Sequence, residues 1–233
     1  MKKLIVILLF SFILIGCEAE DSNMKSAKIN NALTKIDESS SMSVKYTANF
    51  DEAFSIELNG KYDFQKESFK QVGVSTYEQE QYEFAEYYEK VEDGYNFYYL
   101  REGENWYYTF SDDYELIFEG NSMLYENQLE KPFSFLRNVD EENISIVDEN
   151  IYLVKVNNDS LFSYIFSDEV IEYDYFEVHL TFEGNNLKKI EFEVNVDEEN
   201  ALFKWEILSL NDYEFELSEE IKAAEYVEFN FEE

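Results

Sequence analysis

The chain has 233 residues, of which 52 are acidic, 18 are Lys or Arg and one is histidine, so its formal net charge is −34. This charge excludes nucleic acid as a partner, because contact with the phosphate backbone needs a basic surface. Hydrophobic residues make up 45% of the chain and aromatic residues 18%, which is too much apolar surface for a disordered protein, so we expect a folded domain with an acidic, solubilising surface.

The amino terminus has the layout of an export signal. Met1-Lys2-Lys3 supplies a basic flank, and Leu4–Ile15 is apolar apart from Ser11. A helix that spans a bilayer needs about 20 apolar residues, so this run is too short to remain as a membrane span. Residues 1–16 are therefore predicted to be a signal peptide.

Leu14-Ile15-Gly16-Cys17 resembles the bacterial lipobox, which consists of an aliphatic residue, a small or β-branched residue, a Gly, Ala or Ser, and a cysteine. The resemblance implies that Cys17 receives a diacylglycerol group and becomes the new amino terminus, and two acyl chains hold a protein stably on a bilayer. The alternatives are an ordinary secretory signal with a chance cysteine, or a short membrane anchor. We expect a lipid-anchored protein on the extracytoplasmic face of a bacterial cell membrane.

Cys17 is the only cysteine, so the mature domain has no disulfide, and cysteine-ligated metals and cysteine nucleophiles are excluded beyond that position. Without Lys2 and Lys3 the mature chain has 16 basic and 52 acidic residues, a net charge of −36 that favours standing off an anionic bilayer. Residues 17–26 are polar after the cysteine and lack periodicity, so they are predicted to be a lipidated tether.

Residues 27–233 are predicted to form a single β-rich domain that begins with a helix. Ile29, Ala32, Leu33 and Ile36 recur at helical spacing, which predicts a helix over Ala27–Glu38. The period then changes to two, and alternating apolar and polar residues predict a hairpin over 42–64.

Alternation continues along most of the remaining chain, at residues 106–110, 144–146, 152–156, 176–182, 190–196 and 203–207. Gly184-Asn185-Asn186 predicts a tight turn between strands 175–183 and 187–196. After Ile207 the apolar positions shift phase to Leu208 and Leu210, which predicts a bulge or bend.

The predicted helices are few and short. Asp159 is placed to cap one carrying Leu161–Phe166, Pro132 suits the first turn of one carrying Phe133 and Leu136, and Ser218 begins one that runs to Val227. The fold class expected is mainly β (α+β), with a strongly curved antiparallel sheet or unclosed barrel covered on one face by a few short helices.

This order of elements resembles the LolA/LppX-like bacterial carriers of lipids and lipoproteins. The resemblance depends on the lipobox, the helix Ala27–Glu38 leading into hairpin 42–64, the late hairpin Phe176–Val196 with its Leu187–Glu191 segment, and the final strand followed by Ser218–Ala224. Members of that group fold as an unclosed barrel wrapped over helices, and some hold acyl chains between the two layers. The resemblance implies the same arrangement here.

No pattern of residues points to catalysis or to a cofactor, and we expect no enzyme activity. His179 is the only histidine and is predicted to point outward from its strand, so a multi-histidine metal site is not indicated, and the sequence has no Ser-centred elbow or Gly-rich phosphate loop. The acidic turns 139–143 and 196–200 offer oxygen ligands that calcium prefers, but their spacing does not match an EF-hand, and carboxylate pairs such as Asp112-Asp113 are common throughout.

Two functions remain open. The first is non-covalent binding of an apolar or lipid-like ligand under the sheet, and the second is an acidic, Tyr-rich module with a solid core that contacts a protein or an envelope polymer. The alternating pattern is the same for a solid and a hollow core. Tyr87-Tyr88 and Tyr98-Tyr99 are predicted to place one ring on each face, so their outward rings are candidate partner contacts.

Overall fold

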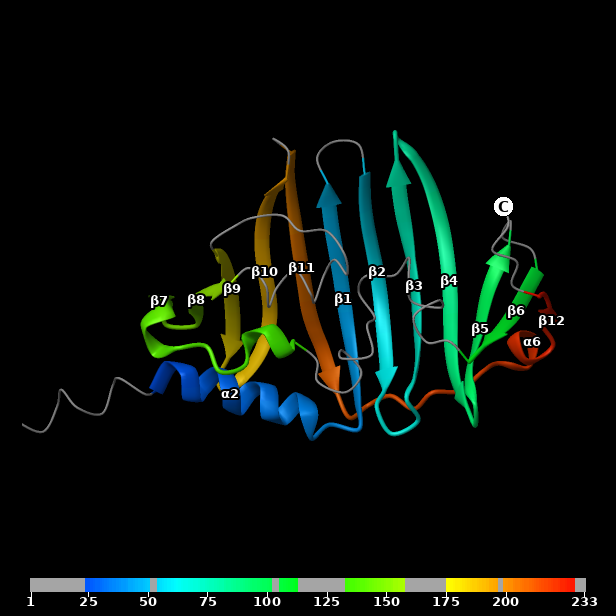
Figure 1. Ribbon diagram of the computed structural model, residues 1–233, viewed down its shortest axis with the longest axis horizontal. Coiled ribbons are helices and arrows are strands. Elements are labelled where there is room, and N and C mark those ends of the chain that lie inside the picture. The colour runs from blue at the N-terminus through cyan, green and yellow to red at the C-terminus, as the bar shows by residue number, and fades with distance from the viewer. Residues whose placement is uncertain are drawn as a thin grey trace, which may run out of the picture.

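The computed structural model describes residues 24–50, 54–101, 105–112, 133–157, 175–196 and 199–228. These residues form one mixed 12-stranded sheet that does not close into a barrel, together with two short α-helices (Figure 1). The expected fold class is therefore confirmed. The carboxyl-terminal strand makes the sheet mixed, because it pairs in parallel with its neighbour.

The first half of the domain contains one helix and six strands. Helix α2 spans Met24–Asp37. It begins three residues before Ala27, the start predicted from the sequence. The strands that follow are β1 (Ser41–Phe50), β2 (Phe54–Asp63), β3 (Ser68–Tyr77), β4 (Glu80–Val91), β5 (Gly94–Arg101) and β6 (Asn105–Ser111).

The second half returns to the middle of the sheet. Its elements are the 3-10 helices η1 (Ser134–Leu136) and η2 (Glu141–Asn143), strands β7 (Ile144–Asp148), β8 (Ile151–Asn157), β9 (Tyr175–Glu183), β10 (Asn186–Val196) and β11 (Glu199–Leu210), then helix α6 (Glu219–Lys222) and strand β12 (Glu225–Tyr226). The strand order is β12-β6-β5-β4-β3-β2-β1-β11-β10-β9-β8-β7. Strand β1 therefore pairs with β2 on one side and with β11 on the other, and joins the two halves.

The two predicted hairpins are confirmed in register. Met42 lies opposite Tyr62 and Phe50 opposite Phe54, while Phe182 lies opposite Leu187 across a turn in which Gly184 has a φ of +59°. A left-handed backbone costs glycine least, which explains the residue at this turn. The predicted change of phase is also confirmed, because the register between β1 and β11 shifts so that Val44 faces Ile207 while Ser43 faces Ser209.

Alternation gives the sheet two chemically different faces. We call the face toward α2 the inner face and the opposite one the outer face. Helix α2 crosses the inner face near β9 and β10, and its apolar stripe of Ile29, Ala32, Leu33 and Ile36 is fully buried there (Figure 1). Inner-facing residues of β1 and β8–β11 complete this core, among them Val154, Val178, Leu180 and Ile190, all 0% exposed. This half of the inner face is solidly packed.

A side chain from a distant part of the chain defines the start of α2. Oε2 of Glu141 accepts the backbone N–H of Ser26 at 2.9 Å, and Oε1 accepts that of Lys25 at 3.3 Å. The first turn of a helix leaves its N–H groups without partners inside the helix, so an acceptor from η2 can extend the helix toward the amino terminus. Residues 24–26, predicted to belong to the tether, are helical for this reason.

The predicted helices at other positions are shorter than expected. Phe133 directly precedes the 3-10 helix η1, and Leu136 is its last residue. Pro132 and the helix predicted after Asp159 lie outside the described residues. Ser218 caps α6 as predicted, with its hydroxyl accepting the N–H of Ile221. The predicted continuation to Val227 is wrong, because Glu225 and Tyr226 pair with β6 and the N–H of Val227 bonds to the carbonyl of Tyr108.

Candidate ligand-binding face of the sheet

A continuous row of aromatic rings crosses the inner face from β2 to β6. We call it the aromatic row, and its members are Tyr62, Phe69, Tyr88, Phe97, Tyr99 and Tyr107. Consecutive ring centroids lie 5.8, 4.2, 4.7, 5.2 and 6.2 Å apart. Most consecutive rings belong to residues directly opposite each other on neighbouring antiparallel strands, which brings their side chains into contact.

Burial falls along this row. Tyr62 is 6% exposed and Phe69 and Tyr88 are 0% exposed, as parts of the main core. Phe97, Tyr99 and Tyr107 are only half-buried, as is Phe84, which points to the same face from β4. We call these four residues the open inner face. Apolar rings that remain partly accessible beside a packed core are typical of a surface that binds an apolar ligand.

A polar cluster interrupts the open inner face. The carboxylate of Glu86 accepts hydrogen bonds from the amide Nε2 of Gln71 and from the Tyr88 hydroxyl, the latter at 3.2 Å. Glu86 lies opposite Gln71 on β3 and Tyr99 on β5, so its side chain lies within the row of rings. The sequence interpretation missed it, although the alternation in Phe84-Ala85-Glu86-Tyr87-Tyr88 carries the signal, because Glu86 has the same parity as Phe84 and Tyr88.

The outer face is not uniformly acidic, although the composition predicts an acidic surface. Lysines and carboxylates alternate across β10, β11 and β1, where Glu206 lies opposite both Lys189 and Lys45. Three ion pairs are found in this region: Lys45–Glu57 at 2.7 Å, Lys189–Glu191 at 3.2 Å, and Lys204–Glu206. The hydrogen bond from Lys204 lowers the pKa of Glu206, with nearby lysines adding to the effect. The centre of the outer face is therefore charged but nearly balanced.

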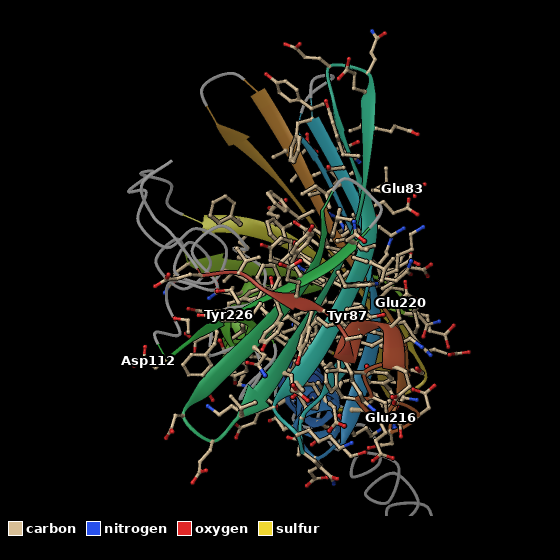
Figure 2. The ribbon with its side chains drawn as sticks, turned by 90° about the vertical axis from the view of Figure 1, so that its right-hand side faces the viewer. Glu83, Tyr87, Asp112, Glu216, Glu220 and Tyr226 are labelled. Carbon is tan, nitrogen blue, oxygen red and sulfur yellow. The ribbon has the colours of Figure 1, made fainter. Side chains whose placement is uncertain are left out.

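An open groove of about 810 Å³ lies on the outer face over β1–β5. Its lining includes the apolar residues Val72, Val74 and Ala85 and the carboxylates of Glu57 and Glu83. Figure 2 shows Glu83 at the outer side of β4. Glu57 is paired with Lys45, and the mixed apolar and polar lining offers no single recognisable ligand chemistry.

The prediction that Tyr87-Tyr88 and Tyr98-Tyr99 divide between the two faces is confirmed, but their outward rings are not free for a partner. Residues 211–224, which we call the C-terminal strap, cross the outer face of β4–β6 close to Tyr87 (Figure 2). Tyr98 is 7% exposed and packs with Phe215, Leu217 and Ile221 in a second core. Burial, followed by a hydrogen bond to Glu89, raises the pKa of Tyr98. A pattern of alternation cannot reveal a segment that folds back over the sheet.

The histidine and the acidic turns considered as metal ligands do not form a metal site among the described residues. His179 is exposed on the outer face, opposite Leu153 and Glu191. Glu141, from the first acidic turn, holds the start of α2, whereas part of the second turn and Asp113 lie outside the described residues. Among the residues that the structure describes, no group of three or more His, Cys, Asp or Glu side chains is placed to hold a metal ion.

Cys17, with the rest of residues 1–23, lies outside the described residues, so its lipidation stays a prediction. No helix in the described part of the chain has the length and apolar character needed to cross a membrane. No family model matches the sequence, and no curated protein is significantly similar to it.

Proposed function

We propose that this chain is a bacterial lipoprotein, held at the extracytoplasmic face of the cell membrane by lipid on Cys17, that binds an apolar or lipid-like ligand non-covalently on its open inner face. The observation that carries the proposal is the difference between the two halves of the inner face. Under α2 the apolar residues are packed to exclusion of solvent, whereas Phe84, Phe97, Tyr99 and Tyr107 keep part of their surface accessible.

Burying apolar surface contributes about 25 cal/mol for each Å² removed from water, so accessible rings favour any apolar group that can cover them. The four rings extend from β4 to β6, across three neighbouring strands. With strands about 4.8 Å apart, the surface has a width of roughly 10 Å, which suits one or two acyl chains laid across the sheet. The unclosed sheet also agrees with the LolA/LppX-like architecture that the sequence resembles.

The proposal is tested with purified residues 18–233, which lack the signal peptide and Cys17. Native mass spectrometry is expected to detect co-purified lipid, and the protein is expected to take up at least one of two chain-labelled fluorescent probes, a monoacylglycerol and a fatty acid of equal length. Replacing Tyr107 by alanine should weaken uptake several-fold because it removes a ring of the open inner face.

Phe110→Ala is the matched control, since Phe110 is on the same strand, faces the outer side and is 39% exposed. It should leave uptake unchanged. A ligand-free mass together with no uptake of either probe would contradict the proposal. That result would favour the second candidate, an interaction module for a protein or envelope polymer, for which the outer groove over β1–β5 is the specific supporting feature.

A further inference from the structure

Three of the most exposed large apolar side chains in the described part of the chain lie at the β7 end of the sheet. Met24 is 61% exposed, Val147 is 59% exposed and Ile146 is 54% exposed. We call these three residues the apolar tip. Apolar side chains scattered singly over a surface are normal, whereas adjoining ones indicate a contact with another molecule or with a membrane.

Contacts of helix α2 bring the members of the apolar tip together. Nζ of Lys25 donates to the carbonyl of Ile144 at 2.7 Å, so the residue before this lysine, the first of α2, adjoins the start of β7. Nζ of Lys28 lies 4.8 Å from the ring centre of Tyr152, which is opposite Ile146. Figure 1 shows the start of α2 and strand β7 at the same end of the molecule.

The shape of β7 favours a flat partner over another strand. The register between β7 and β8 shifts between Ile146 and Asp148, so Val147 is the extra residue of a bulge. A bulge re-aims side chains and blunts an edge strand against the addition of a further strand. The hydrogen bond from Lys25 to a carbonyl of β7 has the same effect. A protein that adds a strand to this edge is therefore disfavoured.

The chain leads from this end of the sheet to Cys17, the predicted site of lipid attachment. Met24 is seven residues after Cys17, and seven fully extended residues span at most about 25 Å. The apolar tip is consequently held near the bilayer, and such tethering strengthens a weak contact because it raises the effective concentration of the partner. Exposed carboxylates beside the tip, at Glu142, Asp148 and Glu149, disfavour anionic head groups.

We propose that the apolar tip rests on the bilayer that holds the lipid anchor, among head groups without net charge. The inference rests on the proposed lipidation of Cys17 and adds the orientation of the domain. The open inner face begins at β4, eight strands from β7 in the sheet order, which is about 40 Å along the sheet. Strands β4–β6 and β7 lie at opposite ends of the molecule (Figure 1), so the open inner face projects away from the membrane.

The test measures membrane contact with a dye on the lipidated protein in phosphatidylcholine vesicles. Cys17 is the only cysteine and lipid occupies its thiol, so an introduced cysteine is the single labelling site. A dye on Val147→Cys is expected to lose at least about half of its emission when a nitroxide-labelled lipid is included, because this side chain lies among the head groups. The loss should become smaller when anionic phosphatidylglycerol replaces part of the phosphatidylcholine.

Tyr226→Cys is the matched control, since Tyr226 is 54% exposed and lies on β12 at the opposite edge of the sheet. Its dye should keep its emission. Replacing Met24 and Ile146 together by glutamate should abolish the loss of emission at residue 147, while the protein still floats with the vesicles. Circular dichroism of each variant shows whether the fold is retained.

The outcomes separate this inference from the proposed function. Equal loss of emission at residues 147 and 226, or a loss at 147 that survives the double replacement, would overturn the contact and leave the anchor intact. A loss that is the same with and without phosphatidylglycerol would overturn the preference for uncharged head groups. Absence of the protein from floated vesicles would overturn lipidation and this inference together, and ligand uptake by residues 18–233 is measured independently of both.

Discussion

The backbone N–H of Phe215 donates to Oδ2 of Asp63 at 2.9 Å, and this buried hydrogen bond fixes the C-terminal strap to the end of β2. The other oxygen of Asp63 accepts the N–H groups of Gln65 and Lys66 at 3.1 and 3.0 Å, in the turn that leads to β3. Asp63 is 4% exposed. One carboxylate therefore organises a tight turn and anchors a segment more than a hundred residues later in the chain.

We expect Asp63→Ala to lower the free energy of unfolding by about 3 kcal/mol, because buried N–H groups lose a charged acceptor. Urea unfolding followed by tryptophan fluorescence measures the loss. Asp140→Ala is the control, since Asp140 is exposed and its side chain makes no capping hydrogen bond to η2. A change in Asp63→Ala no larger than in the control would show that the strap is held by its apolar residues alone.

Two tyrosines of the strap region should respond oppositely to loss of the hydroxyl. The hydroxyl of Tyr213 is buried and has no hydrogen-bond partner among the described residues, whereas that of Tyr98 donates to Glu89 at 2.9 Å. Tyr213→Phe is therefore expected to stabilise the protein by about 1 kcal/mol, and Tyr98→Phe to destabilise it by a similar amount. Thermal unfolding of both variants checks the pair, and destabilisation by Tyr213→Phe would show that its hydroxyl is satisfied.

Acid should weaken the attachment of α2 to η2. Desolvation favours protonated Glu141, but hydrogen bonds from Ser26 and Lys25 and the charge of Lys25 outweigh it and lower the pKa of Glu141 from 4.5. A carboxylate whose folded pKa lies below its unfolded pKa stabilises the fold above the unfolded value and loses this effect as pH falls through the folded one.

The stability difference between the parent and Glu141→Gln is thus expected to be largest above about pH 5 and to shrink toward pH 3. Urea unfolding at several pH values measures it. Glu142→Gln serves as control because Glu142 is the exposed neighbour in the same 3-10 helix. A difference that stays constant with pH would contradict an ionised cap.

Replacing Cys17 by alanine should abolish incorporation of labelled palmitate and move the protein from the membrane fraction to the medium or the extracytoplasmic space. The melting temperature of the released domain should equal that of the parent, because the lipid anchor and the packed core involve separate residues. Membrane flotation and palmitate labelling of the full-length protein measure the effect. Continued flotation with undiminished labelling would contradict lipidation of Cys17.

The sequence predicted the elements with strong periodicity. Met42, Val44, Tyr46 and Ala48 alternate in the sequence and are all buried in β1, and the stripe on α2 is buried as predicted. Local turn chemistry was similarly informative at Gly184. In these segments one physical pattern, set by residues close together in the chain, determines the local structure.

Features that depend on distant residues were not predictable in this way. The start of α2 depends on Glu141, which is 115 residues from Ser26 in sequence, and the fate of Tyr98 depends on Phe215 and Leu217 folding back over it. The candidate site shares this dependence in part, because Glu86 accepts a hydrogen bond from Gln71 on the neighbouring strand β3 as well as from Tyr88 on its own strand. An acidic residue at an inner-facing position is a visible signal, but in a chain with 52 acidic residues it does not stand out by itself.

The pairing of β1 with β11 also constrains the order of events during folding. Strands β1–β6 emerge first and can form consecutive hairpins, but one edge of β1 has no partner until residues 199–210 follow. During that interval an edge of alternating Met, Val, Tyr and Ala is open to pairing with other chains. Pairing β11 with β1 closes a loop that contains most of the domain, and closing so long a loop is slow compared with hairpin formation. The protein is therefore most vulnerable to aggregation before β11 pairs with β1, and a chaperone that shields β1 would act in that interval.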